Sequence, residues 1–221
     1  MIKTLKDFSH WTEMKNQVIQ TDCMEGMKLL PDKCIDLVLT DPPYGIGEAA
    51  GKNKRRSKLA IAKDYGDSDW DDEPIGADKI AELMRVGKNQ VIFGGNYFEL
   101  PPSPCWIVWD KNNSGDFADC ELAWTSFESA VRKFKWTWNG MIQENMKQKE
   151  IRHHPTQKPV DLMRWILENY SKEGDLICDP FMGSWTTARA CKDLGRDFIG
   201  FELSEDYCKV GEERLRQEVL F

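Results

Sequence analysis

Short apolar runs alternate with stretches of helical spacing along most of this chain. The run at 35–40 (Ile-Asp-Leu-Val-Leu-Thr) is apolar at nearly every position, as is typical of a strand buried on both faces of a parallel sheet. Residues 160–170 and 204–217 place apolar side chains every three or four positions, as in an amphipathic helix. Strands that alternate with helices predict βαβ units, and therefore an α/β, doubly wound, mainly parallel Rossmann-like sheet.

The same pattern assigns the remaining elements. Residues 121–127 and 134–138 are predicted to be antiparallel strands that extend the sheet. Ser204 is expected to cap the last helix. Further strands are expected at 18–20, 90–93, 106–109, 176–178 and 198–201, and further helices at 24–30, 75–86 and 186–194.

Composition indicates one globular domain over residues 1–221, since 41% hydrophobic and 30% charged residues are ordinary usage at this length. No apolar stretch is long enough for a transmembrane helix, and the polar start of the chain lacks the apolar core of a signal peptide. The seven cysteines are scattered without a C-x-x-C pair. This distribution favours reduced thiols in a cytoplasmic protein and gives no metal site.

A long polar stretch at 46–74 interrupts the alternation and is expected to be a mobile loop. A dense basic group comes first in it and a dense acidic group follows. The basic residues are Lys52, Lys54, Arg55, Arg56 and Lys58. The net charge of −7 argues against a generally cationic surface, but a local cluster of this kind suits nucleic-acid phosphates. The alternative is a solvated surface loop.

The strand at 35–40 ends in Asp41-Pro42-Pro43-Tyr44, which brings together the groups needed to hold a planar amine. The Asp41 carboxylate can accept one amine N–H and the Pro42 carbonyl the other, while the Tyr44 ring stacks on the flat substrate. Both prolines fix φ and make the turn rigid. Alone, the motif also fits a Pro-Pro turn with an aspartate cap and a surface tyrosine.

A second candidate half-site follows the strand at 176–178. The turn at 179–184 (Asp-Pro-Phe-Met-Gly-Ser) leads into a helix, and its glycine lets a ligand approach the backbone. Glu202 ends the next strand, about twenty residues on, where such folds hold a nucleotide ribose. Together they indicate a cofactor that contains a nucleoside. Capping or salt bridging at strand ends is the alternative role for Asp179 and Glu202.

Three segments make the chain resemble the amino-group DNA methyltransferases that use S-adenosylmethionine. They are 40–44 (Thr-Asp-Pro-Pro-Tyr), 154–159 (His-Pro-Thr-Gln-Lys-Pro) and 179–184. The catalytic motif precedes the cofactor motif, as in the circularly permuted beta class, and the likeness covers residues 18–215. The resemblance implies methyl transfer to the exocyclic amine of a DNA base, adenine more often than cytosine with this motif, after base flipping.

The resemblance also implies a role for each matching residue. Asp41, Pro42, Pro43 and Tyr44 would hold and stack the target base, with no metal ion. Thr156 and Lys158 would line the methionine end of S-adenosylmethionine, and Glu202 would take its ribose hydroxyls. The full set of implied cofactor residues is Asp22, Cys23, Thr156, Lys158, Asp179, Phe181, Gly183, Ser184 and Glu202.

Two features depart from the family pattern. Its glycine turn normally reads F-x-G-x-G, but the last position here is Trp185. The indole either rotates outward and leaves the cofactor pocket open, or narrows the pocket and weakens cofactor binding.

The second departure is a short target-recognition region at 128–153. Its cations suit phosphate contacts, and its tryptophans suit either base stacking or core packing. Recognition is therefore expected to be short or relaxed, or completed by a second copy in a homodimer. The residues concerned are Arg132, Lys133, Lys135, Trp136, Trp138, Lys147, Lys149 and Arg152.

Other functions fit part of the pattern. A methyltransferase for the cytosine exocyclic amine or for RNA would carry the same motifs, whereas Trp185 favours a non-catalytic DNA-binding module on this scaffold. An oxidoreductase with a nicotinamide cofactor gives no role to segments 40–44 and 154–159. A small solitary enzyme of the leading kind fits a restriction-modification system or a phage.

Overall fold

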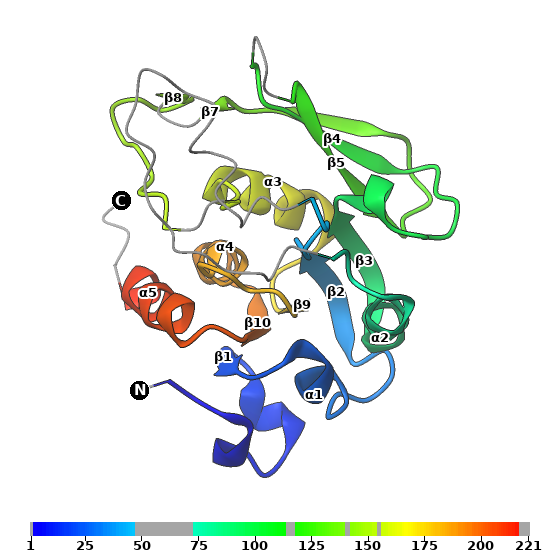
Figure 1. Cartoon of the computed structure of the whole chain (residues 1–221), viewed down its shortest axis with the longest axis vertical. Coiled ribbons are helices and arrows are strands. Elements are labelled where there is room, and N and C mark those ends of the chain that lie inside the picture. The colour runs from blue at the N-terminus through cyan, green and yellow to red at the C-terminus, as the bar shows by residue number, and fades with distance from the viewer. Residues whose placement is uncertain (1, 47–72, 114–117, 140–141, 154–155, 217–221) are drawn as a thin grey trace.

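The computed structural model describes residues 2–46, 73–113, 118–139, 142–153 and 156–216, and its centre is an eight-stranded mixed sheet (Figure 1). Its spatial order is β1-β10-β9-β2-β3-β5-β4-β6. The first five strands in this order pair in parallel, which confirms the predicted mainly parallel sheet. The strands are β1 (Gln17–Gln20), β2 (Ile35–Thr40), β3 (Gly87–Phe93), β4 (Trp106–Asp110), β5 (Cys120–Thr125), β6 (Arg132–Lys135), β9 (Leu176–Asp179) and β10 (Asp197–Glu202).

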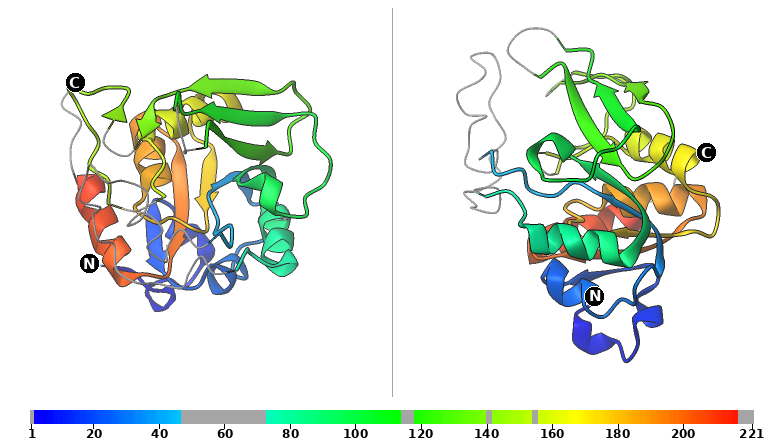
Figure 2. Two further views of the ribbon diagram at one scale, coloured as in Figure 1. Left: turned by 45° about the horizontal axis from the view of Figure 1, so that its top comes forward. Right: turned by 90° about the vertical axis from the view of Figure 1, so that its right-hand side faces the viewer.

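Apolar residues on both faces of β2 explain why helices cover both sides of the sheet. Leu37 and Leu39 belong to the hydrophobic core on one face, and Val38 belongs to the core on the other. The first core includes residues of α3 (Val160–Tyr170), α4 (Thr186–Leu194) and α5 (Glu205–Arg216). The second includes residues of α1 (Cys23–Met27) and α2 (Ala77–Val86). Figure 2 shows these layers, and the sheet is doubly wound as predicted.

Most helix boundaries agree with the sequence pattern. Helices α3 and α4 have the predicted bounds, and α5 begins after Ser204, whose hydroxyl accepts a hydrogen bond from the Tyr207 N–H at 3.3 Å. Helix α1 is shorter than the predicted 24–30. Beyond Met27 the chain tightens into turns, with the Leu30 N–H donating to the Met27 carbonyl at 3.0 Å just before Pro31.

The extension of the sheet corrects one strand prediction. Strand β5 is antiparallel to β3 and β4 as expected, but β6 runs parallel to β4. Because β6 reverses direction after β5 yet lies on the far side of β4, it must run with β4. The end of the predicted strand 134–138 belongs instead to a hairpin, in which β7 (Trp138–Asn139) pairs antiparallel with β8 (Ile142–Gln143).

In the described part of the chain, short 3-10 helices that were not predicted are η1 (Leu5–Asp7), η2 (Trp11–Met14) and η4 (Gly95–Tyr97). All seven cysteines are free thiols, and Cys120 is exposed while Cys34 is half-buried. Within the described ranges, no helix is long and apolar enough to cross a bilayer.

Candidate active site at the carboxyl edge of the sheet

Acidic side chains gather at the edge of the sheet where the parallel strands end. Asp41 directly follows β2, Asp179 ends β9, Glu202 ends β10, and Asp22 lies just beyond β1. Because these four strands are neighbours and parallel, the topology brings together residues that are far apart in the sequence. Ligands of doubly wound sheets bind at this edge.

Each oxygen of the Asp41 carboxylate already has a donor. The Tyr44 hydroxyl donates to Oδ1 at 2.5 Å, and the Lys158 Nζ donates to Oδ2 at 2.5 Å. Burial raises the pKa of Asp41, and the ammonium of Lys158 opposes that rise. The ionised carboxylate keeps further lone pairs on both oxygens, so it can accept another N–H.

Lys158 lies between two carboxylates, one of which the sequence did not single out. Its buried Nζ is 2.5 Å from Asp41 Oδ2 and 3.2 Å from Glu121 Oε2. Burial alone would lower the pKa of Lys158, but the two carboxylates raise it. The ammonium therefore stays charged and is shared between Asp41 and Glu121.

Glu121 comes from β5 and is a firmly ionised counter-ion. Burial alone would raise its pKa, but Lys158 and Lys111 together lower it to about 2. Its Oε1 pairs with the Lys111 ammonium. The only sequence signal for this residue was an acidic side chain inside an otherwise apolar strand.

The Tyr44 ring is enclosed by residues that follow β3. Tyr97 stacks on it with 5.1 Å between ring centroids and 13° between planes, and Phe98 meets it edge-on at 6.1 Å. Gly94 has a φ of +66°, and a Cβ there would lie 2.2 Å from Tyr44 Cε1. Only glycine therefore allows this approach. Tyr97 is 47% exposed, so one face of Tyr44 is covered by a surface side chain.

Asp179 is buried and fully engaged inside the protein. It accepts hydrogen bonds from the Thr40 hydroxyl at 2.7 Å, the Thr187 hydroxyl at 2.6 Å and the Phe181 N–H at 3.1 Å. Burial raises the pKa of Asp179 to about 6, although these donors oppose the rise. Its carboxylate thus ties the ends of β2 and β9 to the start of α4.

Glu202 closes the glycine turn. Its two oxygens accept the Gly183 N–H at 2.7 Å and the Ser204 N–H at 2.8 Å. Gly183 has a φ of +52°, which brings its N–H toward this carboxylate. Burial raises the pKa of Glu202 to about 7. Each oxygen retains a lone pair for a hydroxyl donor.

Trp185 takes the left-handed backbone conformation expected of a glycine, with a φ of 64° and a ψ of 34°. Its ring is buried and packs on α5, where a Cβ added to Gly211 would lie 2.1 Å from Trp185 Cδ2. It also lines a small pocket with Gln17 and Phe198, near the amino ends of β1 and β10. The indole therefore points away from the carboxyl edge that carries Glu202.

The other implied cofactor residues have varied surroundings. Asp22 is exposed and caps α1 by accepting the Met24 N–H at 2.8 Å. Cys23 is buried, and burial raises the pKa of its thiol to about 11, so it remains protonated. Pro42 is buried, and the half-buried members are Pro43, Thr156 and Phe181.

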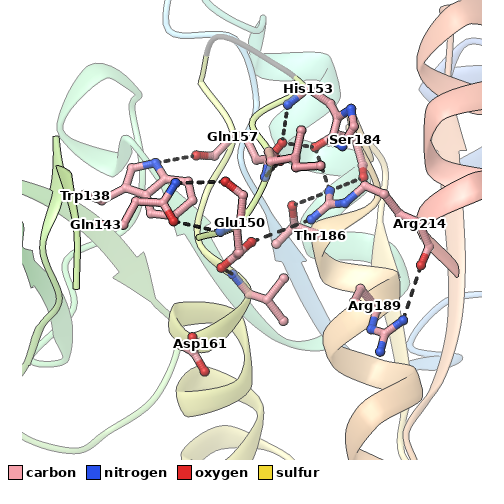
Figure 3. A network of polar contacts seen from close by, with 12 residues as sticks. Trp138, Gln143, Glu150, His153, Gln157, Asp161, Ser184, Thr186, Arg189 and Arg214 are labelled. Atoms are coloured by element: carbon pink, nitrogen blue, oxygen red, sulfur yellow. Dashed lines mark hydrogen bonds and ion pairs between the residues drawn. The ribbon is translucent and has the colours of Figure 1, made fainter. Parts of the chain in front are cut away.

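Ser184 is buried in a polar network rather than presented to solvent (Figure 3). Its hydroxyl donates to Gln157 Oε1 at 3.2 Å and accepts from Arg214 Nη1 at 3.0 Å. Sequence reasoning missed Arg214, which looks like an ordinary charged position near the end of an amphipathic helix.

The residues predicted to contact DNA are only partly described. The cluster predicted to hold phosphates lies outside the described residues; it comprises Lys52, Lys54, Arg55, Arg56 and Lys58. On the edge strand β6, Arg132, Lys133 and Lys135 are exposed. Trp138 is buried in the core, and the half-buried Trp136 packs against the same core.

Comparison with known proteins identifies methyltransferases among the relatives of this chain. A family model described as DNA methylase, for N6 and N4 enzymes, matches residues 105–213. Type II methyltransferase M.HinfI of Haemophilus influenzae is 27% identical, over 91% of this chain and 68% of the relative. Type II methyltransferase M2.DpnII of Streptococcus pneumoniae is 23% identical, over 95% of this chain and 92% of the relative.

Solved structures share the fold. The crystal structure of the M1.HpyAVI–SAM complex aligns with a TM-score of 0.53 and 27% identity, over 90% of this chain and 98% of that one. TTHA0409 from Thermus thermophilus, a putative DNA modification methylase complexed with S-adenosyl-L-methionine, aligns with a TM-score of 0.53 and 17% identity. That alignment covers 92% of this chain and 95% of the other, and shows likeness of fold.

Proposed function

Because this chain belongs to the amino-group DNA methyltransferases, we propose that it transfers a methyl group from S-adenosylmethionine to the exocyclic amine of adenine in DNA. The observation that carries the proposal is the Asp41 carboxylate beside the Tyr44 ring, next to the acidic edge formed by β1, β9 and β10. The aspartate and tyrosine of the motif favour adenine over cytosine.

The acidic edge fits the proposed cofactor. S-adenosylmethionine offers two ribose hydroxyls and an adenine amine as donors, and it carries a positive sulfonium. Glu202 can accept the hydroxyls with its remaining lone pairs, and exposed Asp22 can accept the amine. A partly buried carboxyl whose pKa is raised to about 7 is well suited to a ligand that brings donors and positive charge.

Asp179 takes an indirect part in this scheme. Its donors are Thr40, Thr187 and the Phe181 N–H, so it fixes the turn that carries Gly183. The packing of Trp185 on α5 supports an open pocket at that turn. When bound, S-adenosylmethionine supplies an electrophilic methyl carbon whose bond to sulfur breaks as the amine attacks.

The target amine would be held by acceptors matched to its two hydrogens. Asp41 accepts one N–H and the Pro42 carbonyl the other, which draws the nitrogen toward tetrahedral geometry. As the amine nitrogen gains positive charge, the carboxylate stabilises that charge and takes the proton that the nitrogen loses. No metal ion or covalent intermediate is needed.

Lys158 and Glu121 prepare Asp41 for this role. In the described arrangement Lys158 is bonded to Asp41, yet Glu121 offers the same ammonium a second carboxylate at 3.2 Å. Lys158 can therefore turn toward Glu121 while Asp41 receives the base amine, and the buried ammonium never loses its counter-ion. The same lysine then remains available to the methionine end of the cofactor.

The base would have to leave the duplex, since its amine otherwise faces the pairing partner. Tyr44 is stacked on Tyr97, whose ring is 47% exposed. A flipped base can take the place of this surface ring on Tyr44. The aromatic contact then repays part of the few kcal/mol that unstacking costs.

The test is methyl transfer from labelled S-adenosylmethionine to unmethylated genomic DNA, with digestion and mass analysis of the product base. We expect N6-methyladenine. Asp41→Ala should lower transfer by at least about a thousandfold, because it removes the acceptor on the reacting nitrogen. Calorimetry should find its cofactor affinity within about threefold of wild type, because Asp41 belongs to the base site.

Asp206→Ala is the control, since that side chain is 92% exposed at the start of α5. A fully active Asp41→Ala protein would overturn the assignment of the base site. Methylated cytosine, or transfer to RNA alone, would replace adenine in DNA as the substrate. Cofactor binding without transfer to any nucleic acid would favour the non-catalytic module.

A further inference from the structure

A polar network joins the predicted recognition segment to the glycine turn (Figure 3). One end is formed by Gln143, Glu150 and His153, which belong to the segment 128–153. The other end is Ser184 and Thr186, where the turn enters α4. Arg214 on α5 and Gln157 connect the two ends. None of these contacts follows from the catalytic scheme above.

Arg214 is a buried cation that donates hydrogen bonds to the end of the glycine turn. Its Nη1 donates to the Ser184 hydroxyl at 3.0 Å, to the Thr186 hydroxyl at 3.2 Å and to the Ser184 carbonyl. Its side chain is 10% exposed, and burial lowers its pKa. A buried guanidinium is costly unless it also has a carboxylate partner.

The carboxylate nearest to Arg214 among the described residues is Glu150. The distance from Arg214 Nη2 to Glu150 Oε2 is 3.8 Å, and Oε2 has no hydrogen bond within the described part of the chain. This pair is therefore close enough to attract but is not closed into a hydrogen-bonded ion pair, which needs about 2.7–2.9 Å. A small shift of either residue would close it.

The backbone of Glu150 is held by the recognition segment. Its backbone is bracketed by Gln143 on β8, which accepts the Glu150 N–H at 2.8 Å and donates to its carbonyl at 2.9 Å. Its Oε1 accepts the Val160 N–H at the start of α3, at 3.0 Å. Displacing the hairpin β7–β8 therefore displaces Glu150 relative to Arg214.

Gln157 forms a second connection between the same two parts. Its Oε1 accepts the His153 N–H at 2.9 Å and the Ser184 hydroxyl at 3.2 Å, and its carbonyl accepts the Trp138 indole N–H at 3.1 Å. The segment and the turn are thus joined by the hydrogen bonds of Gln157, in addition to the approach of Glu150 to Arg214. Because buried polar groups tolerate little loss of partners, displacement of the segment should alter the hydrogen bonds that hold the turn.

We propose that Glu150 and Arg214 are a positioning pair that couples DNA binding on the recognition segment to cofactor binding at the glycine turn. DNA contact with the segment closes the 3.8 Å gap, and Arg214 then holds the Ser184 turn in the geometry that binds cofactor. This inference rests on the proposed function. Neither residue is placed in contact with the reacting atoms.

The test measures binding, not turnover. The dissociation constant of S-adenosylhomocysteine, which carries no methyl group to transfer, is determined by calorimetry with and without unmethylated genomic DNA fragments. For the wild type we expect DNA to tighten its binding by about 5–20-fold. Glu150→Gln keeps an oxygen for the Val160 N–H but removes the charge facing Arg214. The DNA effect should then fall below about twofold, with binding in the absence of DNA changed less than about threefold.

Arg214→Lys gives an independent measurement, and decides the matter if Glu150→Gln does not fold. An ammonium keeps the charge but cannot reach both the turn and Glu150 with a planar fork, so the DNA effect should fall here too. In the double variant it should fall no further than in either single one, since both changes break the same link. Glu205→Gln is the matched control, because it removes an exposed ion pair with Lys209 at 2.8 Å on the same helix.

An unchanged DNA effect in Glu150→Gln and Arg214→Lys would overturn the inference, as would a wild type in which DNA leaves the binding of S-adenosylhomocysteine unchanged. Failure of the coupling can be distinguished from failure of the proposed function. A wild type that methylates DNA normally but lacks the coupling retains the proposed function. A wild type that neither binds S-adenosylhomocysteine nor methylates DNA loses both.

Discussion

Trp185 combines two unfavourable features, a left-handed backbone conformation and a buried indole N–H. A left-handed φ of 64° costs an L-residue about 1–2 kcal/mol, and its indole Nε1 is buried without a hydrogen bond among the described residues. The compensation is burial of the ring against Gly211, where even a Cβ on α5 would collide with it. The Trp185 side chain thus belongs to the core on the α5 face, while its backbone keeps the left-handed conformation of a glycine turn.

Replacing this residue tests that interpretation. Trp185→Gly should lower the free energy of unfolding by about 1–4 kcal/mol, because losing a buried aromatic ring costs about 3–5 kcal/mol and relief of the backbone strain returns about 1–2 kcal/mol. Affinity for S-adenosylmethionine should change by less than about threefold. Urea denaturation and calorimetry measure the two quantities. A gain in cofactor affinity of a hundredfold or more would show that the ring obstructs the pocket.

Strands β5, β4 and β6, which extend the parallel part of the sheet, contribute a carboxylate to the candidate active site and a row of cations to the surface. Strand β5 inserts between β3 and β4 and carries Glu121 to the Asp41–Lys158 pair. Strand β6 is an edge strand with an exposed row of cations. Such a row blocks edge-to-edge pairing of sheets, and it also suits phosphate contacts.

Removing the positive charges of β6 distinguishes a role in DNA binding from a role in edge protection. Changing Arg132, Lys133 and Lys135 to Gln should weaken DNA binding and reduce the slope of log affinity against log salt by about 2–3, since each phosphate contact contributes about 0.9. Cofactor affinity should be unchanged. Fluorescence anisotropy with labelled duplex DNA at several salt concentrations measures the slope.

The matched control changes three exposed lysines elsewhere to Gln: Lys28, Lys88 and Lys209, whose ion pairs lie on the surface. It changes the net charge by the same amount, three positive charges. If both triple variants lose the same slope, the effect is one of total charge and β6 has no special place in the interface. Aggregation of the β6 variant without loss of DNA affinity would assign the row to edge protection.

For the molecule as a whole, the burial of three carboxyls makes stability depend on pH. Burial raises the pKa of Asp179 to about 6 and those of Glu150 and Glu202 to about 7. Unfolded carboxyls titrate near pH 4. Between about pH 4.5 and 7 the folded state therefore binds more protons than the unfolded state, so the free energy of unfolding falls as pH rises through this window.

We expect the midpoint of thermal unfolding of the ligand-free protein to be at least about 5 °C lower at pH 8 than at pH 5.5. Carboxyls whose pKa folding lowers, such as Glu121 and Asp36, titrate below this window, so they are already ionised in both states within it and do not reverse the trend. Scanning calorimetry across the range measures it. A midpoint that rises steadily with pH would contradict this account of the three buried carboxyls.

The sequence by itself determined the α/β architecture and the location of the candidate site at the carboxyl edge of the sheet. Runs buried on both faces require helices on both sides of the sheet, and polar motifs after apolar strands must lie at a carboxyl edge. The bounds of α3 and α4 and the placement of Asp41, Asp179 and Glu202 therefore followed from local patterns. The direction of β6 did not, because it depends on which side of β4 the strand takes.

Only the tertiary structure decided which side chains meet. Lys158 reaches Asp41 across 117 positions of sequence, and Arg214 reaches the Ser184 turn from another helix. No local pattern encodes such a pair, since its energy depends on burial and on a distance set by packing. The same holds for Trp185, whose direction was fixed by the space beside Gly211. Sequence thus specified the groups at the edge of the sheet, and packing specified their partners.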